Sequence, residues 1–321
     1  RVSSCDCYSK EVLVNILLDN VNIFSKSGPN HFGAKLVKYL DRLGNKCMLP
    51  PQDGADVKLS FIETRQIIKT EPLVLRLDGI YFDPDQNYEL KNGNIVRSYQ
   101  QADGVIFQSE FNRDISFKYF GEHPNHTVIN NGADIEYMDT INPLVHPKLD
   151  NFETVWCCAA TWRRWKRLKE NIMYFLQHSG PKDCLVVAGH VDAKDAIVHN
   201  RIFFVGDIDV QSLYALYKRS KYLIHLARYD SCPNVVVDAR AAGCQIICSS
   251  IAGTKEIAGP DAIMIYEDPW DYSPASTTNL PEISFDKVVE NSYNTNIDMT
   301  DVSKRYNEFL KETLNASAKT D

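Results

Sequence analysis

Short apolar runs and amphipathic segments alternate regularly along the second half of the chain. Runs of consecutive apolar residues predict buried strands, and segments with apolar residues three and four positions apart predict helices. The pattern predicts strands at residues 154–160, 184–189, 202–205, 222–227 and 245–250, and helices at residues 168–178, 210–220, 233–242 and 254–258. Strands that alternate with helices in this way form a parallel sheet with helices on both faces. We therefore expect a doubly wound α/β domain in this half.

The first half shows the same kind of pattern in a less regular form. An amphipathic helix is predicted at residues 34–43, with Gly44 placed to end it, whereas residues 12–18 are too few to decide between a strand and a helix. Strands are predicted at residues 21–24, 57–62, 72–79, 103–109 and 127–132. The predicted fold class is α/β, with two Rossmann-like, doubly wound parallel-sheet domains that face each other across a cleft.

A turn-rich stretch with two prolines separates the two halves at residues 143–150. Since it contains few residues suited to a core, we interpret it as a linker. The length of 321 residues also suits two domains. We expect a first domain at residues 1–146 and a second at residues 147–300, in which residues 268–296 form a loop. Residues 301–321 carry the apolar stripe of a final amphipathic helix.

The composition is that of a soluble globular protein, with 44% hydrophobic and 24% charged residues. A formal net charge of −7 argues against a general nucleic-acid binder, which needs a basic surface. No apolar run approaches the length of a membrane span, and the first residues lack a signal-peptide pattern. The nine cysteines show no paired CxxC spacing, so we expect reduced thiols in a cytoplasmic protein and no zinc site.

Two carboxylates stand eight positions apart around the start of a predicted helix. Asp230 follows a predicted strand, and Asp238 lies in the helix that we expect to begin near Pro233. We expect the Ser231 hydroxyl to cap this helix and Gly243 to end it. Acid pairs at any one spacing are common in a chain with 42 acidic residues, so the pair needs support from its surroundings.

The densest group of positive charges follows the first predicted strand of the second half, in Thr161-Trp-Arg-Arg-Trp-Lys-Arg-Leu-Lys169. Arginine can bind phosphate oxygens with two parallel hydrogen bonds, and lysine adds a point charge. Arg163 and Lys166 flank a predicted helix start at the ligand-binding edge of the sheet, where they are placed to hold a diphosphate. A solvated basic turn and a nucleic-acid patch with interleaved tryptophans are the alternatives. The position at a strand end favours phosphate binding.

Two features of the first half are expected at the same kind of edge. The glycine-containing loop at residues 25–33 precedes a predicted helix, so its backbone amides either meet an anion or simply form a tight turn. Asp78 and Gly79 end a predicted strand at its carboxyl edge, where open parallel sheets bind ligands.

Three segments, taken in this order, resemble the retaining GT-B glycosyltransferases of the large glycogen-synthase-like group, the family 4 type. They are Val128-Ile-Asn-Asn-Gly-Ala-Asp134, Trp162-Arg-Arg-Trp-Lys-Arg-Leu168, and Asp230-Ser-Cys-Pro-Asn-Val-Val-Val-Asp-Ala239 followed by Gly243. The resemblance implies an acceptor-side first domain, a nucleotide-sugar-binding second domain, and a final helix that crosses back to the first domain. It implies transfer of a sugar from a UDP- or GDP-linked donor to a carbohydrate or glycoconjugate acceptor.

The resemblance also implies roles for the charged residues of the second half. Arg163 and Lys166 would neutralise the donor diphosphate, so that no metal ion or other cofactor is needed. Asp230 would meet hydroxyl groups of the donor sugar, and Asp238 would accept the ribose hydroxyls. The family usually has glutamate at both acidic positions. Since aspartate is one methylene shorter, a misplaced carboxylate would lose charged hydrogen bonds worth about 1.5–3 kcal/mol each.

Further site residues follow from the same resemblance. The backbone amides around Asn234 and Val235 would contact the sugar and the phosphates at a helix start. Gly28 and its neighbour Asn30 match the first-domain loop that approaches the donor phosphates. Asp78 stands where relatives often carry a histidine at the reaction centre, so we count it with Asp230, Arg163 and Lys166 as a candidate catalytic residue.

Three other functions remain open at this point. A metal-dependent glycosyltransferase would use an Asp-x-Asp motif, and Asp83-Pro-Asp85 and Asp207-Ile-Asp209 have that spacing. A nucleotide-sugar-binding subunit with weakened catalysis would fit the paired aspartates. A sugar-nucleotide epimerase on the same scaffold would use histidines, for which His31, His190 and His225 are the candidates.

Overall fold

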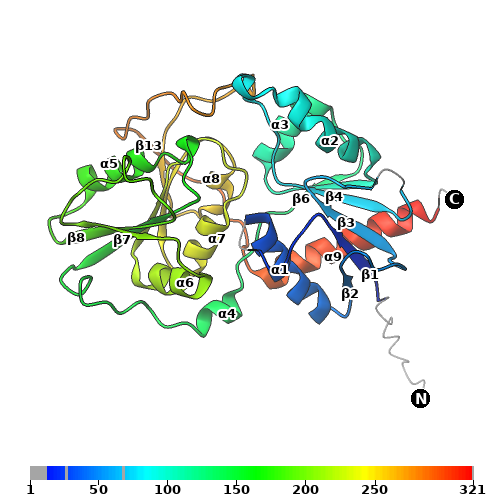
Figure 1. Ribbon diagram of the computed structural model, residues 1–321, viewed down its shortest axis with the longest axis horizontal. Coiled ribbons are helices and arrows are strands. Elements are labelled where there is room, and N and C mark those ends of the chain that lie inside the picture. Colours follow the sequence, from blue (N-terminus) through cyan, green and yellow to red (C-terminus); the bar gives the residue numbers. More distant parts are fainter. Residues whose placement is uncertain (1–12, 26–27, 67–68, 320–321) are drawn as a thin grey trace, which may run out of the picture.

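The computed structural model describes residues 13–25, 28–66 and 69–319. These residues form two lobes, each built on one sheet, and Figure 1 shows them side by side. The first lobe contains a six-stranded parallel sheet, and the second contains a seven-stranded sheet that is parallel except for one edge strand. Helices cover both faces of each sheet. The predicted α/β class with two doubly wound parallel sheets is therefore confirmed.

The first sheet has the strand order β2-β1-β3-β4-β5-β6. Its strands are β1 (Asn15–Asp19), β2 (Lys46–Met48), β3 (Val57–Phe61), β4 (Leu73–Leu77), β5 (Gly104–Phe107) and β6 (His126–Val128). Helices α1 (Gly28–Arg42) and α9 (Met299–Ser317) cover one face, and α2 (Tyr88–Gln101) and α3 (Glu110–Phe120) cover the other. Successive strand residues serve opposite faces. Val74 packs in the core under α1 and α9, whereas Leu75 packs in the core under α2 and α3.

The strand predicted at residues 21–24 is wrong, because the first strand lies earlier, at Asn15–Asp19. Ile16 and Leu18 are fully buried. Ile16 pairs in register with both neighbouring strands, and Leu18 pairs with Leu59 of β3. Asn20 then adopts a left-handed backbone conformation with φ of 56°, which ends the strand. The following residues form a turn in which the Phe24 side chain is 87% exposed. Helix α1 begins at Gly28, six residues before the predicted helix start.

The second sheet has the strand order β13-β12-β11-β10-β7-β8-β9. Its strands are β7 (Thr154–Ala159), β8 (Asp183–Ala188), β9 (Ile202–Gly206), β10 (Tyr222–His225), β11 (Gln245–Ser249), β12 (Ile263–Ile265) and β13 (Val288–Val289). Helix α5 (Leu168–His178) covers one face. The other face carries α4 (Ile135–Asp139), α6 (Val210–Arg219), α7 (Asn234–Ala241) and α8 (Thr254–Ile257). The neighbours Cys157 and Cys158 point into these two different cores.

Several elements were not predicted, namely α2, α3, α4, β2, β12 and β13. Helix α2 buries Asn92, Ile95, Ser98 and Tyr99, so half of its buried face is polar and gives no clear apolar stripe. Strand β13 has two residues and pairs antiparallel with β12 inside the stretch predicted as loop. None of the helices in the described ranges is both long and apolar enough to cross a bilayer.

The last helix returns to the first lobe. Met299, Tyr306 and Leu310 of α9 are fully buried in the same core as α1 and the first sheet, and Figure 1 shows α9 running beside α1. Just before α9, the backbone of Ala133 donates a hydrogen bond to the carbonyl oxygen of Ile297 at 2.7 Å. The chain therefore enters the second lobe just after Gly132 and returns from it just before α9, and these two crossings lie side by side.

Candidate active site

A cleft between the lobes gathers residues that follow strands of both sheets. We call it the central cleft; its volume is about 410 Å³. Its lining includes Gly28, Asp78, Gln108 and Asn131 from the first lobe and Lys166, Asp230, Asn234 and Asp238 from the second. The carboxyl ends of strands in open parallel sheets are the usual position of ligands. Seven of the nine predicted site residues line this cleft: Gly28, Asp78, Lys166, Asp230, Asn234, Val235 and Asp238.

Asp230, Lys166 and His225 form a charged group at one end of the central cleft. Lys166 ends a short 3-10 helix, η2 (Arg164–Lys166), after β7, and its Nζ pairs with Asp230 Oδ2. His225 Nε2 lies 3.0 Å from the same oxygen. Burial by itself would raise the pKa of Asp230, but the charge of Lys166 and the hydrogen bond from His225 hold that pKa well below its ordinary value. Asp230 is therefore ionised at neutral pH and can accept hydrogen bonds from hydroxyl groups.

His225 supports the carboxylate and does not act as an independent acid. Burial lowers the pKa of His225 below its ordinary value, although the hydrogen bond with Asp230 and the charge of that carboxylate act in the opposite direction. A neutral imidazole can donate from only one nitrogen. Since Nε2 faces the Asp230 carboxylate, the neutral ring carries its proton on Nε2 and donates it to Asp230.

Asp238 lies on α7 and is bound to the other lobe. Lys35 of α1 places its Nζ 3.1 Å from Asp238 Oδ1, and the same nitrogen donates to the carbonyl oxygen of Gly132 at 2.7 Å. His31 Nε2 lies 3.9 Å from the other carboxylate oxygen. Lys35 and Asp238 are both almost fully buried. A ligand hydroxyl that meets Asp238 must therefore share the carboxylate with Lys35, a partner that the sequence did not reveal.

The start of α7 differs from the prediction in its cap. The residue at the N-cap is Pro233, with no side-chain hydrogen bond to the helix, so the expected cap by Ser231 is wrong. The first backbone N–H groups of a helix have no partner within it. Asn234 and Val235, which open α7, both line the central cleft. The Asn234 side chain donates to the carbonyl oxygen of Gly28 at 2.8 Å and so joins the lobes.

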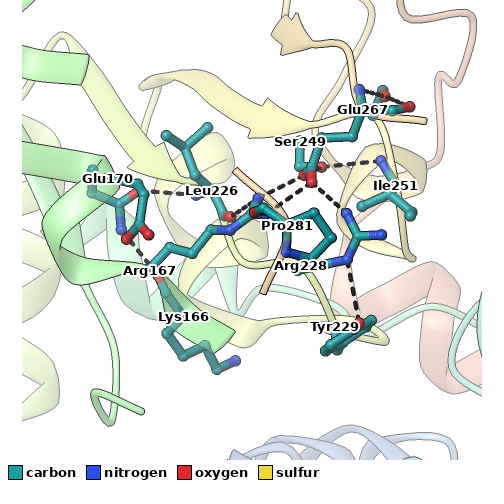
Figure 2. A network of polar contacts seen from close by, with 12 residues as sticks. Lys166, Arg167, Glu170, Leu226, Arg228, Tyr229, Ser249, Ile251, Glu267 and Pro281 are labelled. Carbon is teal, nitrogen blue, oxygen red and sulfur yellow. Dashed lines mark hydrogen bonds and ion pairs between the residues drawn. The ribbon is translucent and has the colours of Figure 1, made fainter. Parts of the chain in front are cut away.

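The basic cluster divides into residues that face a cavity and residues that hold the fold. Arg164 pairs with Glu170 at 2.7 Å along α5. Arg167 is fully buried and binds both carboxylate oxygens of Glu267, at 2.7 and 2.8 Å (Figure 2). Lys166 lines the central cleft, and Arg163 is exposed at the rim of an adjoining cavity. The two cations predicted to hold a diphosphate are thus the two that remain accessible there.

Glu267 is the centre of the buried network in Figure 2. Besides Arg167, it accepts a hydrogen bond from Arg228 at 2.5 Å and one from the Ser249 hydroxyl. Burial would raise the pKa of Glu267, but the hydrogen bonds and charges of its arginine partners lower it below the ordinary value. Arg167 also donates to the carbonyl oxygen of Pro281 at 3.0 Å. The network attaches the segment after β12 to the loops that carry the cleft residues.

Asp78 forms an ion pair with a buried arginine that was not predicted from the sequence. Arg76 of β4 is fully buried, pairs with Asp78, and donates to Asn131 Oδ1 at 2.8 Å. Its guanidinium carbon lies 4.3 Å from the ring centroid of Phe32. Burial raises the pKa of Asp78 above its ordinary value, although the charge of Arg76 and a hydrogen bond with Gln108 lower it. An arginine inside the apolar run at residues 73–77 was the available signal.

Asn30 is placed elsewhere. Its Oδ1 accepts a hydrogen bond from the backbone of Asn22 at 2.9 Å, and it lines a hollow of about 1070 Å³ on the first lobe with Asp19 and Lys58. The structure therefore separates Asn30 from the other predicted site residues.

The two Asp-x-Asp motifs serve as helix caps. Asp83 caps the 3-10 helix η1 (Pro84–Gln86) and binds the backbone and hydroxyl of Thr277, at 3.0 and 2.5 Å. Asp209 caps α6 through the backbone of Ser212 at 2.8 Å. Within the described part of the chain, no three His, Cys, Asp or Glu side chains are grouped so that they could hold a metal ion.

Further contacts close the lobes behind the central cleft. Glu256 of α8 accepts hydrogen bonds from the backbone N–H groups of Glu110 and Phe111, at 2.8 and 3.0 Å, and so binds the first turn of α3. Burial raises the pKa of Glu256 to about 7, against the lowering effect of these hydrogen bonds.

The backbone N–H of Gly253 donates to the carbonyl oxygen of Asp230 at 2.9 Å. A Cβ atom at Gly253 would lie 1.8 Å from the carbonyl oxygen of Ser231, so this approach needs glycine.

Residues 154–276 match the family of group 1 glycosyl transferases. The matched region contains the accessible cations Arg163 and Lys166 and both carboxylates, Asp230 and Asp238. The second lobe therefore carries a group 1 glycosyl transferase domain.

Solved structures show that the chain has the GT-B fold. Sucrose-phosphate synthase from Thermosynechococcus elongatus superposes with a TM-score of 0.63 at 12% identity, covering 94% of each chain. HepE from Anabaena in complex with UDP-glucose gives 0.59 at 14% identity, covering 94% of this chain and 92% of that one. The catalytic domain of starch synthase IV from Arabidopsis thaliana, bound to ADP and acarbose, gives 0.64 at 9%, covering 95% and 99%. No curated protein sequence matches the chain.

Proposed function

We propose that this glycosyltransferase is a retaining, metal-independent enzyme that moves a sugar from a UDP- or GDP-linked donor to a carbohydrate or glycoconjugate acceptor. Residues 1–146 would form the acceptor side, and residues 147–300 would bind the nucleotide sugar. The final helix, residues 301–321, would tie the two together. The observation that carries the proposal is the Lys166–Asp230 pair at the edge of a cleft between two parallel sheets.

The donor diphosphate would lie between Lys166, Arg163 and the start of α7. When the bond to the sugar breaks, the leaving diphosphate gains negative charge, which fixed cations and helix amides stabilise. Lys166 is partly exposed, so its Nζ can reach a ligand while it pairs with Asp230. The amides of Asn234 and Val235 would add hydrogen bonds from the positive end of the helix. These groups supply the charge that a metal ion provides elsewhere, which supports metal independence.

The two carboxylates would position the donor. Asp230, held ionised by Lys166 and His225, would accept hydrogen bonds from sugar hydroxyls. Asp238 would accept the ribose hydroxyls and share its charge with Lys35. Asp78 would lie at the reaction centre. The similar HepE structure was determined with UDP-glucose, which supports a UDP-linked donor.

A nucleotide-sugar-binding subunit with weakened catalysis is the second candidate. Both carboxylates already have a lysine partner, Lys166 for Asp230 and Lys35 for Asp238, so a donor competes with these pairs.

The free, buried thiols of six described cysteines support a cytoplasmic setting, in which thiols stay reduced.

Turnover of sugar nucleotides decides between the two candidates. Purified protein is incubated with UDP-, GDP- and ADP-linked hexoses and a panel of glycoside acceptors, with and without a chelator. We expect release of the nucleoside diphosphate, unchanged by the chelator, and a product whose anomeric configuration by NMR matches that of the donor. Asp230→Asn should lower this turnover about tenfold or more, because a charged hydrogen bond to the donor is lost. Tight binding of a nucleoside diphosphate without any turnover would favour the binding subunit instead.

A further inference from the structure

A second cavity of about 500 Å³ adjoins the central cleft. The two cavities share six lining residues: Gly28, Asp78, Thr161, Lys166, Asp230 and Ser231. The far part of the second cavity is lined by five aromatic side chains, which are Tyr81, Phe82, Phe111, Trp165 and Tyr229. We call this part the aromatic chamber. Its near end is therefore the place where the proposed donor sugar and leaving group would meet an acceptor.

The rings of the chamber wall pack on one another and form a rigid surface. The centroids of Phe82 and Tyr229 lie 5.0 Å apart, with the rings edge to face. Trp270 packs behind both, with centroid distances of 4.9 Å to Phe82 and 5.0 Å to Tyr229. Trp270 belongs to the segment that arches from the second lobe to the first at the top of Figure 1. The hydrogen bonds of Thr277 to Asp83 fasten this segment to the first lobe.

Polar groups at the far end of the chamber are bonded to each other. Asp83 accepts hydrogen bonds from Thr277 and, at 2.9 Å, from the side chain of Gln86, which also donates to Thr277 at 3.1 Å. The Tyr229 hydroxyl accepts a hydrogen bond from Arg228 at 3.3 Å. At the near end, Lys166 and Arg163 are accessible cations. A ligand therefore meets charged and hydroxyl-binding groups at one end and aromatic rings at the other.

We propose that the aromatic chamber is an acceptor subsite for the aglycone of a glycoside, and that this aglycone is a flat, uncharged, apolar ring. This inference rests on the proposed function. The sugar of the acceptor would lie at the near end, where hydroxyl groups find partners. A sugar ring in the far end would bury hydroxyl groups without partners, at a cost of about 1–3 kcal/mol each. Aromatic side chains instead favour a second ring in offset or edge-to-face contact.

The position of the chamber also defines the chemical step. An acceptor hydroxyl oxygen forms a bond to the anomeric carbon of the donor sugar on the face from which the diphosphate leaves, and the bond from that carbon to the diphosphate oxygen breaks, so the configuration is retained. The electron pair of the broken bond leaves with the nucleoside diphosphate. The hydroxyl proton passes to the carboxylate of Asp78, which lines both cavities. No further reactant is needed.

Matched acceptors test the proposal without any mutation. Phenyl and methyl glycosides of the same sugars are compared as acceptors with the donor that the enzyme turns over. The phenyl glycoside should have a KM about tenfold lower, the equivalent of one favourable ring contact in addition to burial. Equal KM values for the phenyl and methyl glycosides would overturn the proposal.

A variant at the chamber rim adds a second test. Tyr81 is 44% exposed and lines the chamber, so Tyr81→Ala should fold normally. It should raise the KM for the phenyl glycoside several-fold, leave the methyl glycoside unchanged, and leave donor hydrolysis by water unchanged. Tyr137, with 40% exposure and no place in the chamber, provides the control Tyr137→Ala. An undiminished phenyl preference in Tyr81→Ala would contradict the assignment.

Direct binding separates this inference from the proposed function. If no sugar nucleotide is turned over, the proposed function fails, and the chamber is tested by titrating phenyl and methyl glycosides while tryptophan fluorescence is recorded. Trp165 lines the chamber and Trp270 lies behind its wall, so a bound ring should quench their emission. Quenching by the phenyl glycoside alone would support the chamber. Equal responses to both glycosides would overturn it.

Discussion

Substitution of Lys35 by methionine keeps an unbranched side chain that is one atom shorter and removes a buried charge between the lobes. In the folded protein Lys35 Nζ lies 3.1 Å from Asp238 Oδ1, and the two side chains are 5% and 4% exposed. Removing one partner of a buried ion pair leaves an uncompensated charge and costs about 3–5 kcal/mol. The lost hydrogen bond to the Gly132 carbonyl oxygen adds about 1 kcal/mol. We expect Lys35→Met to lower the free energy of unfolding by about 4–6 kcal/mol.

A double-mutant cycle measured by urea unfolding isolates the contact. Asp238→Asn removes the charge from the other side, and the double variant should recover a large part of the loss, because no charge is then left unpaired. Burial and then the charge of Lys35 lower the pKa of His31, so this pKa should rise in Lys35→Met, as NMR titration can show. Lys182→Met, at an exposed pair with Glu153, is the control and should change nothing measurable.

The cycle has a clear outcome that refutes this reasoning. If the effects of Lys35→Met and Asp238→Asn simply add, the two side chains do not interact in solution and the lobes do not close as described. A loss below about 1 kcal/mol in Lys35→Met would show the same, because that value is typical of an exposed pair.

Four further substitutions test other parts of the structure. The folded protein holds a proton on Glu256 up to about pH 7, whereas the unfolded chain releases it near pH 4.5. The free energy of unfolding should therefore fall by about 3 kcal/mol as the pH rises between these values. Glu256→Gln should flatten this slope in urea unfolding measured at several pH values. Gly253→Ala should lower the melting temperature, since its Cβ meets the Ser231 carbonyl oxygen. As a control, Gly93→Ala lies in open space on α2 and should raise the free energy of unfolding by about 0.5–1 kcal/mol. Arg167→Met should cost about 3–5 kcal/mol in urea unfolding because it leaves a buried carboxylate with one cation fewer, and a loss below 1 kcal/mol would contradict the network in Figure 2.

The order of elements in the second half was predictable because the central strands of its sheet are buried on both faces. Cys157 and Cys158 each enter a core, so β7 appears in the sequence as a continuous apolar run. Asp230 and Lys166 follow the predicted strands 222–227 and 154–160. The structure places these strands, β10 and β7, next to each other and pairs the two side chains.

Contacts between the lobes could not be predicted from local patterns. The Lys35–Asp238 pair joins residues 203 positions apart, and its existence depends on how the two lobes close. The same closure places Glu256 at the start of α3. The sequence located a loop at residues 25–33 but not the start of α1, which begins at Gly28 and places Asn30 in its first turn, beside Asn22. A role for Asn30 at the donor site stays a prediction.

Binding of a nucleoside diphosphate by calorimetry tests the central claim most directly, because the claim is that a donor diphosphate lies beside Lys166. UDP, GDP and ADP are titrated into the wild-type protein, into Lys166→Met and into the exposed control Lys182→Met. We predict that one nucleotide binds the wild type and the control equally, and that Lys166→Met weakens its binding about tenfold to a hundredfold, as the loss of a charged hydrogen bond requires. Equal affinity in all three proteins would contradict the account.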